Sequence, residues 1–254
     1  MRLASLVAVR LLLPVLLLYG LLVGLGLLVT RALPGVWPLT VEDGVNRALA
    51  AERTGPRTDV SLVFSTIAST PAIIAVTAVA ATVLVLLLRR WREPLFLCAA
   101  VSAQAAVFLF TTLAIHRQRP AVDRMDGSLP TSSFPSGHTS AAVALYCGLA
   151  FLLARAATRP FTRAAAWALV AIPLGVALTR MYRGMHHPSD VVASFVNGAA
   201  CLYIMARGIL DKTVPWNPGG RSAVPRRRES TTGPLTTAAP PRPLRPGPAG
   251  PAAT

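Results

Sequence analysis

Three short strings in the second half of the chain combine the residue types that bind a phosphate and pass it through an imidazole. They are Arg119-Pro120, then Pro135-Ser136-Gly137-His138, then Arg180 with His186 and Asp190 downstream. Phosphate oxygens repel a nucleophile until their charge is neutralised, and a guanidinium neutralises it with a planar fork of N–H donors. Arg119 and Arg180 are therefore predicted to bind a phosphate. For either arginine alone, a cationic side chain that extends to the membrane surface is by far the commoner role, and only the pairing with the histidines favours the functional interpretation.

The second string stands directly before an apolar run, and its residues are typical of the start of a helix. A helix N-terminus offers free backbone N–H groups to an anion. Gly137 leaves room for close approach and Ser136 adds a hydroxyl, while His138 is placed to protonate a departing oxygen. The same residues also make an ordinary turn and helix cap.

In the third string, Pro188 suits the first turn of another helix, which places Asp190 in that turn. A carboxylate there can accept a hydrogen bond from one imidazole nitrogen and leave the other nitrogen free as a nucleophile. His186 and His187 both lie within reach of Asp190, and local spacing does not separate them. Asp190 is also favourable at a helix N-terminus without any catalysis.

Long apolar segments must position these strings. The chain has 254 residues, of which 53% are hydrophobic, and its mean hydropathy is +0.54. Both values are too high for an average soluble domain. At 1.5 Å per residue, three charge-free stretches are long enough to cross a bilayer, and three shorter ones reach that length with their polar ends. These stretches are 11–30, 60–88 and 94–115, then 139–154, 164–179 and 191–206.

The sequence therefore predicts an all-α integral membrane protein, a six-transmembrane-helix bundle over residues 1–212. Two spans separate the loop 116–138 from the loop around 180–190, so both loops emerge on the same face. The first loop of that face, 31–59, contains apolar residues at helical spacing between 39 and 53. This segment is interpreted either as a short surface helix or as a plain connector.

The net charge of +15 is a topology signal in this interpretation. With the N-terminus in the cytoplasm, the inner side collects 16 basic and 3 acidic residues, and the outer side 9 and 7. Both termini are thus expected in the cytoplasm, with the site on the extracytoplasmic face, and nucleic acid is not an expected partner. The segment 213–254, rich in Pro and Arg, is predicted to be a disordered cytoplasmic tail. Its run Arg226-Arg227-Arg228 suits anionic lipids or a topology anchor.

The cysteines give no sign of a disulfide framework. Cys98, Cys147 and Cys201 all fall inside apolar runs, where a cysteine behaves as a small buried hydrophobe. The near-total use of Arg over Lys, with many Ala, Pro and Gly residues, indicates a GC-rich genome and hence a bacterial source.

Together the three strings resemble the type 2 phosphatidic acid phosphatase family, whose pattern is K-x6-RP, PSGH and SR-x5-H-x3-D. The likeness covers roughly residues 112–190 and the six-span layout around them. Thr179 replaces the Ser of the third motif, and Thr112 replaces the Lys of the first. Arg117 or His116 is a candidate substitute for that Lys, whereas Arg183 is expected at the surface.

The resemblance implies a membrane lipid phosphatase. It makes His186 the nucleophile that forms a phosphohistidine, Asp190 its orienting group, and His138 the acid and then the base. Arg119 and Arg180 would hold the phosphate, with donors from Ser136 and Gly137. No metal or other cofactor is implied, since arginines neutralise the charge. Polyprenyl phosphates or diphosphates, phosphatidylglycerol phosphate and phosphatidic acid are all candidate substrates.

Three other interpretations remain open at this point. The same basic pocket would serve a non-catalytic protein that binds or transports a lipid phosphate, and Thr112 favours that hypothesis. A structural membrane protein with coincidental motifs would keep Arg119, His138 and His186 far apart. A metal site would need to gather His116, His138, His186 and His187.

Overall fold

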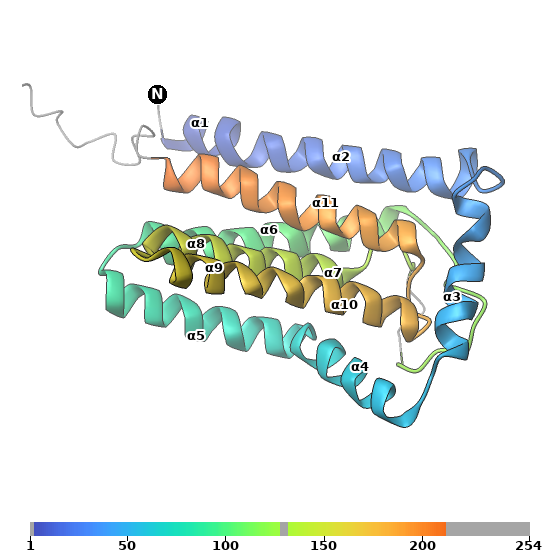
Figure 1. Cartoon of the computed structure of the whole chain (residues 1–254). Helices are drawn as coiled ribbons and strands as arrows, with labels where there is room; N and C mark the ends of the chain where they lie inside the picture. The colour runs from blue at the N-terminus through green and yellow to red at the C-terminus, as the bar shows by residue number, and fades with distance from the viewer. Residues whose placement is uncertain (1–2, 128–131, 212–254) are drawn as a thin grey trace, which may run out of the picture. The chain divides into compact units, whose positions relative to one another are not determined.

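The computed structural model describes residues 3–127 and 132–211, and all regular structure within them is helical. Six helical segments there are long and apolar enough to cross a membrane (Figure 1). They are Ala4–Ala32, Thr70–Leu88, Arg92–Ala114, Gly137–Ala156, Pro160–Tyr182 and Pro188–Leu210. The predicted all-α, six-helix membrane architecture is therefore confirmed. The predicted tail, 213–254, lies outside the described residues.

Several spans join shorter helical pieces end to end. The first contains α1 (Leu3–Val7) and α2 (Leu13–Leu27), with π-helical turns at Ala8–Leu12 and Leu28–Ala32. The second is α5 (Thr70–Leu88) and the third is α6 (Arg92–Ala114).

The last three spans carry the two histidine motifs at their ends. The fourth is α7 (Gly137–Ala142), a π-helical turn (Val143–Cys147) and α8 (Gly148–Ala156). The fifth is α9 (Pro160–Trp167), a 3-10 turn (Ala168–Val170) and α10 (Ala171–Tyr182). The sixth is α11 (Pro188–Met205) followed by a π-helical turn (Ala206–Leu210).

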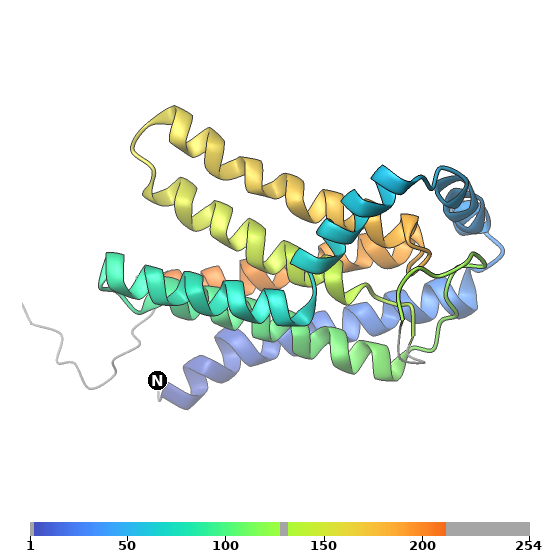
Figure 2. The ribbon, with the colours of Figure 1, turned by 90° about the horizontal axis from the view of Figure 1, so that it is seen from below.

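The predicted single span 60–88 is corrected by the structure, which divides this stretch into two helices. α4 (Gly55–Ile67) ends before Ser69, whose backbone is extended, and α5 begins at Thr70. Pro71 lies in the first turn of α5, where a backbone N–H needs no partner within the helix. In the interior of one continuous helix the missing N–H would break a backbone hydrogen bond, so Pro71 favours a new helix start. α4 runs at an angle to α5 and joins it to α3 (Figure 2).

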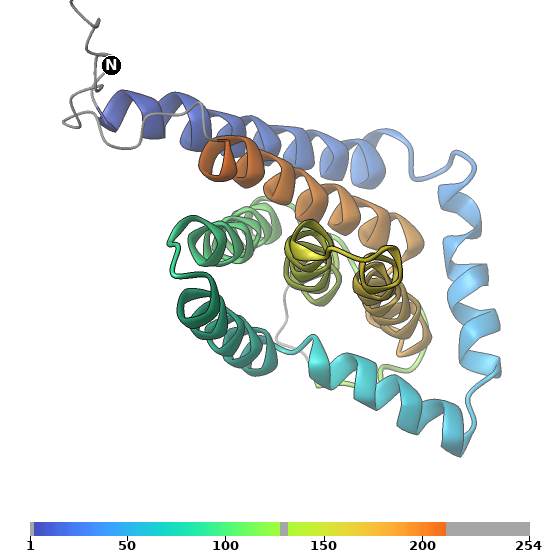
Figure 3. The same cartoon turned by 60° about the vertical axis from the view of Figure 1, so that its left-hand side comes forward.

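The first loop of the site face holds a true helix, α3 (Glu42–Ala51), after a 3-10 turn at Leu39–Val41. The surface-helix interpretation of 39–53 was thus right, and the plain connector was wrong. α3 lies across one end of the spans, beside α10 and α11 (Figures 1 and 3). Its side chains consequently reach the loops that carry the site.

Polar groups tie the spans together where they cross. Ser140 on α7 donates to the side-chain oxygen of Gln104 on α6 at 2.8 Å, and Asn197 on α11 donates to the Gln104 carbonyl at 3.1 Å. Outward faces are apolar instead, with Leu17 66% exposed and Leu87 76% exposed. Such faces suit lipid, because hydrocarbon offers no partner to a polar group.

Candidate active site

The predicted histidines and arginines meet at one cavity. It has a volume of about 560 Å³ and is lined at one end by Arg119, His138, Arg180 and His186. Its remaining wall is mostly apolar and comes largely from the start of α5 and the outer half of α6, including Ile73, Ile74, Val101, Ala105, Phe108 and Leu109. The cavity thus joins a cationic end to an apolar wall.

His186 sits in the short loop between α10 and α11 and is buried. Its Nδ1–H donates to the backbone carbonyl of Ser133 at 2.6 Å. A carbonyl oxygen only accepts, so this hydrogen bond fixes the proton on Nδ1 and leaves the Nε2 lone pair free. The side-chain amide of Asn46 on α3 holds the same residue by donating to the His186 carbonyl at 3.0 Å.

The environment also keeps the His186 ring neutral. Burial lowers its pKa to about 3, and the charges of Arg180 and Arg119 act in the same direction. The Asp190 charge and the hydrogen bond to Ser133 oppose this shift without cancelling it. A neutral imidazole with a bare Nε2 is the form that acts as a nucleophile.

Asp190 lies close to His186, but the two described side chains do not form the expected direct hydrogen bond. Its Oδ2 is 3.9 Å from His186 Nδ1. Oδ2 instead accepts from the Ser133 hydroxyl at 2.9 Å and from the backbone N–H of His187 at 2.8 Å. The second contact belongs to a capping box at the start of α11. Ser133 therefore contacts both the imidazole and the carboxylate.

His138 lies in the first turn of α7, with Ser136 as the N-cap, as the sequence predicted. The space next to Gly137 is filled, however: a Cβ there would lie 2.8 Å from the ring of Phe108 on α6. Gly137 thus allows α6 to pack closely beside His138. Gly137 and His138 still line the cavity.

The two predicted phosphate-binding arginines come from different elements. Arg119, in the loop after α6, donates through Nη1 to the carbonyl of Met185 at 2.7 Å. Burial lowers its pKa, the charge of Arg124 adds to this, and Asp190 opposes it. Arg180, near the end of α10, donates through Nη1 to Asp126 at 2.6 Å and to Ser65 at 2.8 Å.

Two predicted phosphate ligands lie away from the cavity. The Ser136 hydroxyl is buried and accepts from Thr139 as the helix cap, while the Ser136 N–H donates to Ser194 at 2.7 Å. Arg117 is ion-paired with Asp190 and, at 2.6 Å, with Glu42 of α3. Both residues support other parts of the site.

Arg117 also does not restore the cation of the missing Lys. Thr112, which occupies that position, is buried and donates to the Phe134 carbonyl at 3.3 Å, away from the cavity. Arg183, expected at the surface, is buried as well and pairs with Asp126.

The four histidines divide between two hollows. His138 and His186 line the cavity, whereas His116 and His187 line a polar hollow of about 410 Å³ on the other side of Arg119. Within 3–127 and 132–211 no three His, Cys, Asp or Glu side chains are grouped to hold a metal ion. The hypothesis of one four-histidine metal centre is therefore wrong.

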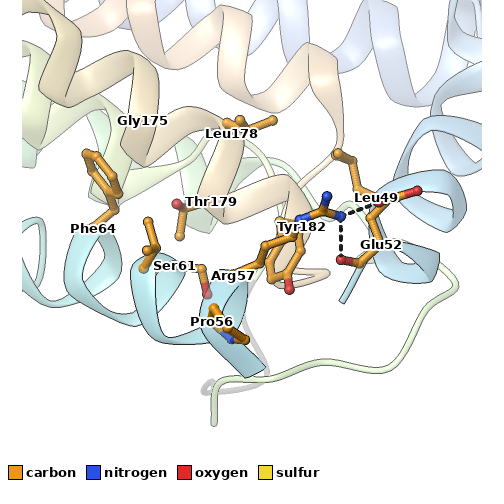
Figure 4. Close-up of a pocket in the computed structure, with 11 residues that line it drawn as sticks. Leu49, Glu52, Pro56, Arg57, Ser61, Phe64, Gly175, Leu178, Thr179 and Tyr182 are labelled. Atoms are coloured by element: carbon orange, nitrogen blue, oxygen red, sulfur yellow. Dashed lines mark hydrogen bonds and ion pairs between the residues drawn. The ribbon is translucent and has the colours of Figure 1, made fainter. Parts of the chain in front are cut away.

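A further groove of about 510 Å³ lies between α4 and α10 and is almost wholly apolar (Figure 4). Phe64 packs against Gly175 there, and the exposed Arg57–Glu52 ion pair lies at its edge. No histidine is among its lining residues. The groove consequently lacks the chemistry of the cavity.

Four supporting residues were missed by the sequence analysis: Glu42, Asn46, Asp126 and Ser133. Glu42 and Asn46 lie four apart, on one face of α3, and both are buried. Polar residues on the face that a surface helix turns inward were the available signal. Asp126 and Ser133 lie in an irregular loop, where no periodicity marks the side chains that turn inward.

Residues 95–213 match the sequence model of the PAP2 superfamily. The resemblance to the type 2 phosphatidic acid phosphatases is thereby confirmed for the part of the chain that carries the site. A comparison with curated protein sequences found no match.

Two solved structures share the fold at 18% identity. The PAP2 type phosphatidylglycerolphosphate phosphatase of Bacillus subtilis has a TM-score of 0.63, covering 75% of this chain and 92% of its own. LpxE of Aquifex aeolicus has a TM-score of 0.51, covering 67% and 97%.

Proposed function

We propose that the protein is a membrane lipid phosphatase that works through a phosphohistidine. One observation carries the proposal: two imidazoles and two guanidiniums, from segments distant in sequence, line a single cavity whose other wall is apolar. The cationic end suits a phosphate and the apolar wall suits hydrocarbon. The family match and the fold shared with the solved phosphatidylglycerolphosphate phosphatase support the proposal.

The first half-reaction transfers the phosphoryl group to His186. Its bare Nε2 attacks phosphorus while the bond between phosphorus and the lipid oxygen breaks, and His138 donates a proton to the departing oxygen. Arg119 and Arg180 neutralise the phosphate oxygens and stabilise the charge that spreads over them in the transition state.

The second half-reaction releases inorganic phosphate. His138, now unprotonated, takes a proton from water as the water oxygen attacks phosphorus. The bond from phosphorus to Nε2 breaks, and its electron pair returns to the imidazole. Each group then has its starting proton again. Because guanidiniums supply the positive charge in both steps, we propose that the reaction needs no metal ion.

The substrate is proposed to be a lipid monophosphate or diphosphate held at the extracytoplasmic surface. The distribution of basic residues supports that orientation, with both termini in the cytoplasm. Phosphatidylglycerol phosphate is the first lipid to test, because a solved structure of the same fold is a phosphatidylglycerolphosphate phosphatase.

The test compares His186→Asn with the unaltered protein, purified in detergent and assayed with EDTA present. Asparagine retains an N–H donor close to the position of Nδ1, so the hydrogen bond to Ser133 can persist while Nε2 is lost. We expect phosphate release from phosphatidylglycerol phosphate, phosphatidic acid and polyprenyl diphosphate mixed micelles to fall by at least about 1,000-fold. His116→Gln, which changes an exposed histidine of the other hollow, is the control and should leave the rate unchanged.

A second experiment tests directly for the phosphohistidine. Brief exposure to ³²P-labelled lipid phosphate should leave label on the protein that is lost in acid and kept in alkali. In the assay of phosphate release, His138→Asn should lower the rate by about 100-fold or more. Tight lipid-phosphate binding by the unaltered protein without any phosphate release would instead favour the non-catalytic binding or transport hypothesis.

A further inference from the structure

Asp126 joins two arginines at the edge of the cavity. Its carboxylate accepts from Arg180 Nη1 at 2.6 Å and from Arg183 Nε at 2.9 Å. Burial alone would raise the pKa of the Asp126 carboxyl, but the hydrogen bond from Arg183 and the charges of both arginines lower it. Asp126 is consequently ionised at neutral pH and offsets the repulsion between two neighbouring guanidiniums.

Two serines of α4 complete the contacts of this pair. Ser65 accepts from Arg180 Nη1 and Ser61 accepts from Arg183 Nη1, each at 2.8 Å. Residues four apart lie on the same side of a helix, and both serines are buried. α4 thus presents two hydroxyls to two guanidiniums, although it is not one of the six spans.

These contacts leave one edge of the Arg180 guanidinium without a partner. Both contacts made by the Arg180 side chain with described residues use Nη1, and its Nε is buried without a hydrogen bond among them. A buried N–H without a partner costs about 1–3 kcal/mol, so this group needs a partner that the described residues do not supply, such as a water molecule or a ligand. Nε and Nη2 form the side-on fork with which arginine binds two oxygens of a phosphate.

Arg180 reaches the cavity, but its anchors do not. Arg180 lines the cavity, whereas Asp126, Arg183, Ser61 and Ser65 are not among the residues that line it. Asp126 therefore does not occupy the place of a substrate phosphate. It contacts the arginine without lining the cavity.

We propose that Asp126, together with Arg183 and the α4 serines, is a positioning residue that holds the Arg180 guanidinium at the cavity, where it binds the substrate's phosphate. The proposal rests on the proposed function, because it assigns a phosphate to the cavity. Fixing a guanidinium in advance stabilises a transition state more than a mobile one does, since no reorganisation is needed during the reaction.

A competing explanation gives Asp126 a structural role alone. The loop is also tied to α10 by a backbone hydrogen bond from Met125 N to the Arg183 carbonyl at 3.2 Å. If Asp126 only anchored the loop, its loss would reduce the amount of folded protein without changing how the remaining sites bind phosphate.

The test replaces Asp126 with Asn, which keeps the size of the side chain and removes its charge. The matched control is Asp123→Asn, an exposed carboxylate in the same loop. Inorganic vanadate, a phosphate analogue, is the probe, measured as a competitive inhibitor and by the thermal shift it gives the full-length protein in detergent. The thermal shift needs no turnover and follows binding by mass action.

We expect Asp126→Asn to raise the vanadate inhibition constant and the KM for lipid phosphate about tenfold or more in the protein that folds. Asp123→Asn should change neither. In an Arg180→Lys background, adding Asp126→Asn should produce little further loss of vanadate binding, because Asp126 acts through Arg180.

The outcomes separate the inference from the function beneath it. Suppose that the unaltered protein releases phosphate but Asp126→Asn binds vanadate normally, or weakens binding equally in the native and Arg180→Lys backgrounds. Only the positioning role is then overturned. If Asp126→Asn does not fold, Ser65→Ala removes the other Nη1 partner and must weaken vanadate binding for the inference to stand. No phosphate release from any lipid by the unaltered protein overturns the proposed function itself.

Discussion

The neighbours of His186 fix the tautomer and the charge of its ring without any substrate. The Ser133 carbonyl accepts a hydrogen bond from the His186 Nδ1–H at 2.6 Å, and burial makes the charged ring unfavourable. Asp190 was expected to orient the ring directly, but its Oδ2 lies 3.9 Å from His186 Nδ1. Asp190 accepts a hydrogen bond from the Ser133 hydroxyl instead, so Ser133 contacts both side chains. A backbone carbonyl therefore takes the place of the carboxylate of a catalytic triad.

This arrangement predicts how the proposed nucleophile, His186, responds to pH. With a pKa of about 3, His186 stays neutral as the pH falls from 7 to 5. A histidine with its ordinary pKa of 6.5 would be only about 3% neutral at pH 5. The rate of phosphoenzyme formation should thus be nearly constant over this range. An aryl phosphate is the right substrate, because its leaving group needs no proton from His138.

Rapid-quench measurement of labelled phosphoenzyme from p-nitrophenyl phosphate, at pH 5, 6 and 7, makes the comparison. The dianion fraction of the substrate is corrected from its own titration. A corrected rate that halves near pH 6.5 would show that His186 titrates normally, and the neutral, buried ring would then be wrong.

At the scale of elements, α3 is not one of the spans, but it contributes a carboxylate to the contacts around the candidate site. Glu42 accepts from Arg117 Nη2 and from the Ser189 N–H, each at 2.6 Å, and Arg117 in turn pairs with Asp190. A chain of charges therefore runs from Glu42 of α3 through Arg117 to Asp190, which lies next to the proposed nucleophile.

Glu42→Gln should lower kcat about five- to fiftyfold while the vanadate inhibition constant stays nearly unchanged. The amide can still accept from Ser189, but it leaves Arg117 without its second carboxylate, so Asp190 and the His186 loop lose a fixed partner. The substitution does not contact Arg119 or Arg180, the arginines proposed to bind phosphate. Steady-state kinetics with lipid phosphate, alongside vanadate inhibition, measures both quantities.

The control is Glu52→Gln, an exposed glutamate just after α3 that pairs with Arg57 at the surface. It should have wild-type kinetics. A Glu42→Gln protein with unchanged kcat, or with kcat and vanadate affinity reduced together, contradicts this role for α3.

Local patterns predicted the elements well wherever a single segment carries its own signal. Helix starts at Gly137 and Pro188 followed from capping residues, and the spans followed from apolar length. The division of 60–88 was missed because apolar length outweighed Ser69-Thr70-Pro71, although Pro71 is a recognised start signal.

The supporting contacts could not be predicted in the same way. Asp126 meets Arg180 across 54 positions, and Asn46 meets the His186 carbonyl across 140. Such pairings depend on how helices pack, which spacing along one segment does not encode. Arg117 illustrates the limit: its position suggested a phosphate ligand, and only the nearby carboxylates of Glu42 and Asp190 give it another role.

At the scale of the whole molecule, the last four spans each place one residue of the candidate site at the same end of the bundle. Arg119 follows the third span, His138 begins the fourth, Arg180 ends the fifth and His186 precedes the sixth. An even number of crossings separates the two histidines, so one membrane face must hold both. The positive-inside distribution then predicts that this face is extracytoplasmic.

Cysteine labelling in intact bacterial cells tests that orientation. Ala121→Cys lies in the exposed loop of the site face, and Thr158→Cys lies in the exposed loop between the fourth and fifth spans. A membrane-impermeant maleimide should label the Ala121→Cys protein at once, because that loop meets the external water. It should label the Thr158→Cys protein only after the membrane is permeabilised. Cys98, Cys147 and Cys201 all lie within spans, so the unaltered protein gives the background. The reverse pattern would place the cavity in the cytoplasm and confine its substrates to the inner leaflet.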